Sequence, residues 1–242
     1  MSTRDIARTA TVSRCPTAVH ATVEGLDLEE LVADKALREL AGIPASSRQR
    51  GARFEKLLAK DDHRLLRDAL AGPLGRTTPI SRGQVSDMRG GFRPGVEGLP
   101  DRAAASVTPL QKMAAGACDA PVVLAGPVLT YRLGTNLRYA EADFVARHVN
   151  GQLVVVEAKA HPMVEGLIVG GAQTDWRLQV SVYANALADL LALWGHGHAV
   201  SDTALLVLPE GYRLTPITVR SLHIAGDRVS AAVTLERLGA GR

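Results

Sequence analysis

Two carboxylates and a lysine in one short segment, residues 139–160, are the residues of this sequence best suited to chemistry. The segment reads YAEADFVARHVNGQLVVVEAKA and contains Asp143 and, after an Asn-Gly pair, Glu157 and Lys159. Glu157 and Lys159 are two positions apart, so on a strand their side chains project from the same face. Whether Asp143 joins them depends on how the intervening turn pairs the two strands.

The pair Asn150-Gly151 predicts a β-hairpin, and the length of its loop decides the register. A two-residue loop would pair Asp143 with Ala158 and would turn the aspartate to the opposite face of the sheet. A three-residue loop, with Gly151 as a left-handed bulge, pairs Asp143 with Glu157. In that register the remaining alternate positions form one continuous apolar face. We therefore predict the three-residue loop.

Two carboxylates opposite each other repel and need a positive partner. A divalent cation neutralises them best, and Lys159 is a weaker partner on its own. Oxygen ligands from Asp143, Glu157 and the backbone carbonyl of Ala158 suit Mg²⁺ or Mn²⁺, which keeps several waters and is completed by phosphate oxygens. Such an ion could activate a water and offset charge on a phosphorane-like transition state. Lys159 could orient or deprotonate that water, or stabilise the phosphate, and the residues leave these roles open.

Segments with helical spacing of apolar residues lie on both sides of this hairpin. Residues 26–40 predict a helix within an N-terminal lead-in, residues 1–45. A second helix begins at Ser46 or Ser47, and Glu55 lies beside its buried apolar stripe. A short helix is predicted from Thr108 to residue 117, and a long one from about residue 172 to 194.

Apolar segments at residues 121–125, 127–133, 204–209 and 229–238 predict further strands. Residues 72–106 carry much of the Gly, Pro and Arg of the chain and predict a long loop or insertion. Strands flanked by helices indicate an α/β domain over residues 46–242, with a mixed central sheet.

The composition is that of an ordinary globular protein. The chain has 242 residues, of which 46% are hydrophobic, and no run reaches the roughly 18 apolar residues of a membrane span. The first residues lack the apolar core of a secretory signal, so we expect a cytoplasmic protein. The net charge of +3 is compatible with a nucleic-acid partner. Cys15 and Cys118 fit no metal-ligand spacing.

Four short motifs follow one another along the chain: Gly51-x-x-Phe54-Glu55, then Asp143, then Glu157-Ala158-Lys159, and finally Gln179-x-x-x-Tyr183. Their order resembles the RecB-like branch of the PD-(D/E)XK nuclease superfamily, and the resemblance covers about residues 47–194. The resemblance implies a restriction-endonuclease-like core and a DNA nuclease that depends on Mg²⁺ or Mn²⁺.

The family's roles transfer residue by residue to this sequence. The resemblance implies that Asp143 and Glu157 bind the metal, and that Glu55 lies near it as a ligand or through a water. It implies that Lys159 is the catalytic lysine. Gln179 and Tyr183, one turn apart on a helix, would contact DNA or brace the site.

The chain departs from the family in three ways. It lacks the four cluster-ligating cysteines of some members, and it has no helicase region, so it would act alone or with a separate helicase or another defence or repair protein. Glu141-Ala142 precedes Asp143 in place of the usual motif, and Glu141 could be a competing ligand or a partner for Lys159. His161 could also reach the site.

Two alternatives to a DNA nuclease stay open on the sequence. One is a nuclease-like module that binds nucleic acid or a partner protein without cutting, and the other is a nuclease that acts on RNA. The intact Glu157-x-Lys159 pattern favours catalysis, since a binding module has no need of it.

Overall fold

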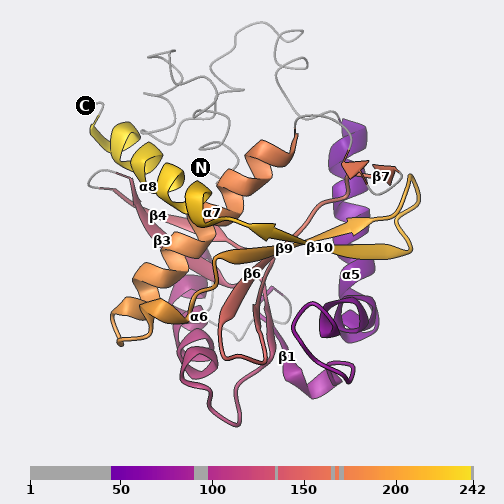
Figure 1. Ribbon diagram of the computed structural model, residues 1–242, viewed down its shortest axis with the longest axis horizontal. Helices are drawn as coiled ribbons and strands as arrows, with labels where there is room; N and C mark the ends of the chain where they lie inside the picture. The colour runs from indigo at the N-terminus through magenta and orange to yellow at the C-terminus, as the bar shows by residue number, and fades with distance from the viewer. Residues whose placement is uncertain (1–44, 90–97, 134–135, 165–166, 169–171, 241–242) are drawn as a thin grey trace, which may run out of the picture.

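A six-stranded sheet carries the predicted hairpin, with strand order β1–β2–β5–β6–β9–β10 (Figure 1). The computed structural model describes residues 45–89, 98–133, 136–164, 167–168 and 172–240. The strands are β1 (Val85–Asp87), β2 (Val123–Ala125), β5 (Phe144–Arg147), β6 (Leu153–Ala158), β9 (Thr203–Pro209) and β10 (Ile217–His223). β1–β2 and β6–β9 are parallel and the other pairs antiparallel. The predicted α/β class with a mixed sheet is confirmed.

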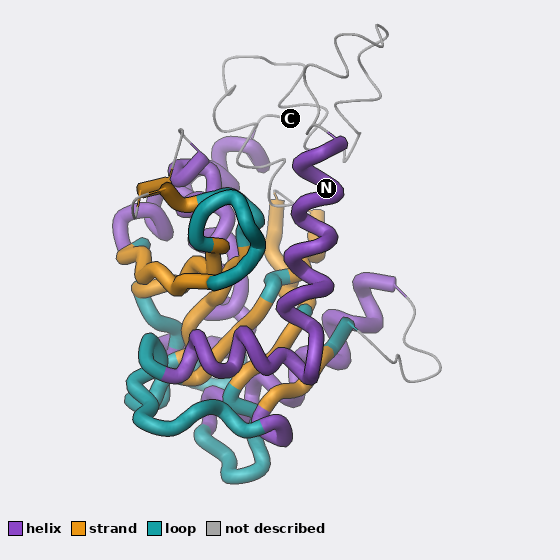
Figure 2. Tube along the Cα trace, turned by 90° about the vertical axis from the view of Figure 1, so that its right-hand side faces the viewer, coloured by secondary structure: helices purple, strands orange, loops and turns teal. Residues whose placement is uncertain are grey.

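Helices cover both faces of this sheet (Figures 1 and 2). On one face, α5 (Ala45–Ala71) packs Phe54 and Leu58 against a core that includes Val154 and Val156. On the other, α6 (Gly98–Ala115), α7 (Ala172–Ala192) and α8 (Ala225–Ala240) contribute to a second core, which includes Val155. Because both faces are buried, β6 can be apolar at consecutive positions.

Two small sheets and two short helices complete the described part of the chain. β3 (Val128–Leu133) and β4 (Asn136–Glu141) form an antiparallel pair that packs on α6 and α7. β7 (Met163–Val164) and β8 (Leu167–Ile168) form the other pair. The 3₁₀ helices are η1 (Arg82–Gln84) and η2 (Gly197–Ala199).

The predicted hairpin register is confirmed. Phe144 pairs with Val156, and the ladder continues outward to the turn, where the His148 amide donates to the Gln152 carbonyl at 2.9 Å. Gly151 has a φ of +89°, the left-handed conformation expected of the bulge. One step beyond the first ladder pair, the same register sets Asp143 opposite Glu157.

The acidic strand, however, is not continuous. β4 ends at Glu141 in the second sheet, and β5 begins at Phe144 in the main sheet. Asp143 therefore lies at the junction between two strands, where the Gly126 amide donates to its carbonyl at 2.9 Å.

The interpretation of residues 72–106 as one long loop is wrong. The stretch contains η1, β1 and the beginning of α6, and β1 adds an edge strand parallel to β2. The helix predicted to start at Thr108 in fact starts at Gly98 and contains Pro109. The Gly and Pro residues of this stretch led to the loop interpretation, although the run from Ala103 to Ala105 that follows them favours a helix.

The C-terminal stretch predicted as a strand, residues 229–238, lies in α8. Its Ala, Leu, Glu and Arg residues favour a helix, and its apolar positions suit either period over so short a span. β10 was not predicted. Helix α7 agrees with its prediction and ends at Ala192.

α5 is broken between its two halves. Lys60 is extended and Asp61, Asp62 and His63 have φ of 53°, 53° and 60°, so the chain turns sharply before the second segment. The helix expected at residues 26–40, like most of the lead-in, lies outside the described residues. Within the described ranges, each helix is too short or too polar to traverse a bilayer.

Candidate active site

Asp143 and Glu157 come together through the register of β5 and β6. One carboxylate oxygen of Asp143, Oδ2, accepts the backbone amide of Ala158 at 2.8 Å. Ala158 is the last residue of β6 and lies between Glu157 and Lys159 in the sequence. The bond therefore holds the Asp143 side chain at the end of that strand. The Asp143 side chain keeps 22% of its surface exposed, whereas the Glu157 side chain is 4% exposed. A ligand would therefore reach the pair from the side of Asp143.

Lys159 is held in a buried chain of polar contacts. Its Nζ lies 2.6 Å from Oε1 of Glu157 and donates to Oε1 of Gln179 at 2.7 Å. The Gln179 amide nitrogen donates in turn to the Tyr183 hydroxyl at 3.0 Å. All four residues are buried, so each contact is made in a low-dielectric interior. The structure thus brings both predicted helix residues, Gln179 and Tyr183, to Lys159.

Arg89 lies over the other oxygen of Asp143. Its Nη2 donates to the Asp143 backbone carbonyl at 2.6 Å and is 3.3 Å from Oδ1, while Nε is 3.2 Å from Glu141. The guanidinium also stacks over the Phe144 ring, 4.9 Å from its centre. Gly126 makes room for this side chain, because a Cβ there would lie 2.2 Å from Cγ of Arg89.

The Glu141 carboxylate forms ion pairs with two arginines. It pairs with Arg89 and, at 2.7 Å, with Arg102 from α6, whose Nη2 also donates to the Gly126 carbonyl. The suggested pairing of Glu141 with Lys159 is not made, since Lys159 pairs with Glu157. Three carboxylates thus face three cations at this end of the sheet.

His63 and Asp87 support the backbone next to Arg89. Nε2 of His63 is 3.0 Å from Oδ2 of Asp87, and Oδ1 of Asp87 accepts the Arg89 amide at 2.7 Å. Burial alone would raise the pKa of Asp87. The hydrogen bonds from His63 and from the Arg89 backbone amide, together with the positive charges of the His63 and Arg89 side chains, outweigh that effect. The pKa of Asp87 consequently lies below its ordinary value.

Glu55 is not joined to the two carboxylates in a ligand cluster. It is exposed on α5, and no group of three or more His, Cys, Asp or Glu side chains suited to a metal occurs within the described ranges. The helix itself passes close to the site, because Arg50 donates to the carbonyls of Ala160 and Tyr212 at 2.5 and 2.7 Å. The role of Glu55 stays a prediction.

The donor set fits a hard divalent ion. Asp143 and Glu157 supply carboxylate oxygens, the Ala158 carbonyl lies on the same strand end, and Asp143 already attracts a cation, Arg89. Mg²⁺ commonly takes one or two carboxylates and fills its other positions with water and phosphate oxygens. Two carboxylates are therefore a sufficient protein contribution.

Sequence reasoning missed Arg89, Arg102, His63 and Asp87. Each lies in or beside the stretch interpreted as a loop, or at the break in α5, and no local pattern links it to Asp143. His161, which the sequence left as a residue that could reach the site, places its ring against Trp176 at 5.5 Å and its Nδ1 3.1 Å from the Pro162 carbonyl.

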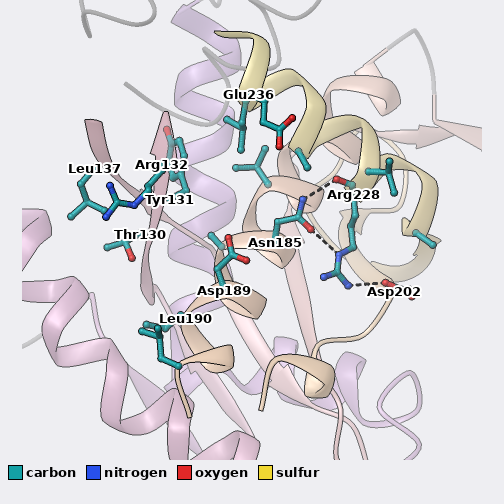
Figure 3. A pocket seen from close by; sticks show the side chains of 17 residues that line it. Thr130, Tyr131, Arg132, Leu137, Asn185, Asp189, Leu190, Asp202, Arg228 and Glu236 are labelled. Atoms are coloured by element: carbon teal, nitrogen blue, oxygen red, sulfur yellow. Dashed lines mark hydrogen bonds and ion pairs between the residues drawn. The ribbon is translucent and has the colours of Figure 1, made fainter. Parts of the chain in front are cut away.

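A separate groove of about 1080 Å³ lies between α7, α8 and the β3–β4 pair (Figure 3). In Figure 3, Arg228 of α8 reaches Asn185 and Asp202, at 2.9 Å to the amide oxygen and 2.7 Å to the carboxylate. Apolar side chains such as Leu193 and Val229 line its rim. None of the predicted site residues lines this groove, so the chemistry expected from the sequence belongs elsewhere.

Comparison with known proteins leaves the site to be interpreted from its geometry. No protein-family model matches the chain, and no curated protein matches it. Among solved structures, the crystal structure of SSO0001 is similar over 72% of this chain and 82% of its own, with 14% sequence identity and a TM-score of 0.32. A likeness at this level carries no argument about fold or function.

Proposed function

We propose that this protein is a metal-dependent nuclease that hydrolyses phosphodiester bonds in DNA. The observation that carries the proposal is the buried Lys159, bonded to Glu157 and Gln179 on the strand end that faces Asp143. Burying a lysine is expensive unless it is paired, and such a lysine next to opposed carboxylates is typical of a reactive centre. The order of motifs along the chain adds independent support.

In this proposal Asp143 and Glu157 hold Mg²⁺ or Mn²⁺, with the Ala158 carbonyl available on the same strand. A bound ion would lower the pKa of a water and offset charge on the phosphoryl group during attack. Glu157 and Gln179 fix the position of the Lys159 ammonium, which then orients the attacking water or neutralises a phosphate oxygen. Entry of the substrate is from the partly exposed side of Asp143.

The supporting residues have a positioning role. Tyr183 accepts from the Gln179 amide, so the amide oxygen of Gln179 is turned toward Lys159. Because Gln179 and Tyr183 are buried, bracing the site fits their positions better than direct contact with DNA. DNA repair or defence against foreign DNA, with a separate helicase as partner, belongs to the same proposal.

The test is cleavage of labelled single-stranded, double-stranded and circular DNA, and of RNA, in a series of metals. We expect cleavage with Mg²⁺ or Mn²⁺ and its loss in Asp143→Asn and Lys159→Ala, each checked for folding by circular dichroism. Asp119→Asn is the matched control, because this exposed carboxylate pairs with Lys112 away from the site. Strong cleavage by either site variant would refute the proposal.

A non-catalytic nuclease-like module is the second candidate. It is favoured by the pairing of Asp143 with Arg89 and of Glu157 with Lys159, which neutralises both carboxylates without a metal. Titration calorimetry separates the candidates, since a binding module need not take up Mn²⁺ at Asp143. Nucleic-acid binding without cleavage or Mn²⁺ uptake would favour this second candidate, and cleavage of RNA alone would favour a ribonuclease.

A further inference from the structure

We propose that Arg89 is a built-in competitor of the divalent ion at Asp143. The inference rests on the proposed function for the identity of the metal site. It goes beyond it by naming a residue, outside the four motifs, that sets how tightly the ion binds.

The first step is the position of the guanidinium. Nη2 of Arg89 is 3.3 Å from Oδ1 of Asp143, and the second oxygen, Oδ2, is already engaged by the Ala158 amide. A carboxylate oxygen that accepts an amide keeps a further lone pair, but Oδ1 is the oxygen that a cation already approaches. A divalent ion on Oδ1 would therefore meet a like charge at ion-pair distance.

The second step is that Arg89 is fixed there by several independent contacts. Its backbone amide is tied to Asp87, and its Nε is paired with Glu141. Its stem packs on Gly126, and its guanidinium lies over the Phe144 ring. Because these contacts do not involve Asp143, they keep the guanidinium beside the carboxylate when an ion arrives.

The third step is the consequence for affinity. With Arg89 in place, the charge of Asp143 is already offset, and an added ion gains less from that carboxylate. A unit charge at ion-pair distance from a divalent ion changes its affinity by about tenfold or more even when screened by water. The protein should thus bind its metal weakly as long as Arg89 stays beside Oδ1.

The test compares the Mn²⁺ affinity of the full chain without nucleic acid, by titration calorimetry and Mn²⁺ paramagnetic resonance. We expect Arg89→Gln to bind Mn²⁺ about tenfold more tightly than the wild type. Arg89→Lys, which keeps the charge, should stay close to the wild type. Arg102→Gln is the matched control, because Arg102 pairs with Glu141 and the Gly126 carbonyl. Thermal melts establish that each variant is folded.

Equal or weaker Mn²⁺ binding by Arg89→Gln would overturn the inference, and so would a gain in Arg102→Gln as large as in Arg89→Gln. Adding Asp143→Asn to Arg89→Gln must abolish the gain, since retained tight binding would place the ion elsewhere. Metal-dependent cleavage by the wild type is scored separately. Cleavage by the wild type together with an unchanged Mn²⁺ affinity in Arg89→Gln would support the nuclease and refute the role of Arg89 as a competitor. A tenfold gain in Mn²⁺ affinity without any cleavage would support the competitor and refute the nuclease.

Discussion

The buried pair of Lys159 and Glu157 should be strongly coupled in stability. The two side chains are 6% and 4% exposed and lie 2.6 Å apart. Removing one partner of a buried pair leaves an uncompensated charge and costs about 3–5 kcal/mol, whereas replacing both by neutral groups is far cheaper. We expect Lys159→Met and Glu157→Gln each to cost about 3 kcal/mol, and the double variant to cost no more than about 3 kcal/mol, which is a coupling energy of at least about 3 kcal/mol.

The measurement is a double-mutant cycle by urea unfolding and thermal melting in metal-free buffer. For a domain of roughly 200 residues, about 3 kcal/mol corresponds to a fall in Tm of about 6–12 °C. Lys112→Met is the matched control, because its partner Asp119 is on the surface, and its Tm should equal that of the wild type. If the costs of the two single variants simply add in the double variant, the reasoning about this pair is refuted.

Three further changes test the surroundings of the site. Asp87→Asn should lower the free energy of unfolding in urea, and this loss should be full above about pH 4 and shrink below it. Asp87 is paired with His63 and has a lowered pKa, so the wild type loses the contribution of this carboxylate as the pH falls through that pKa. Gly126→Ala should lower Tm, since its φ is +63° and the new Cβ meets Arg89; an unchanged Tm would contradict this geometry. Tyr183→Phe should cost about 1 kcal/mol and lower kcat in the cleavage assay, because a buried amide loses its acceptor; unaltered stability would argue against that bond.

The hairpin could be predicted from sequence because its constraints are local. Gly151 sets the turn, and the alternation of Phe144 and Ala146 with Val145 then leaves one consistent register. The same alternation of side chains places Glu157 and Lys159 on one face of the sheet. The long helix that presents Gln179 was predictable for a similar reason, since its apolar stripe extends over several turns.

The contacts of Arg89 could not be predicted, because they depend on tertiary placement. Arg89 and Asp143 are 54 positions apart, and the short strand that precedes Arg89 joins the sheet only as an edge beside β2. Strands of three residues carry little periodic signal. The C-terminal helix shows the same limit, since alternate and helical spacing cannot be told apart over a short run of small residues.

The neutral balance of charges at this end of the sheet also bears on the choice between an enzyme and a binding module. A buried ion pair can often be replaced by apolar residues without loss of stability, so Lys159 and Glu157 are poorly explained by folding alone. Gln179 adds a second acceptor that holds the ammonium in one position, which a purely structural pair does not need. An ammonium fixed beside a partly exposed carboxylate is useful where a negative group must be bound in a defined orientation. A phosphodiester undergoing attack meets that requirement, and the arrangement therefore supports the proposed hydrolysis over the alternative of a binding module.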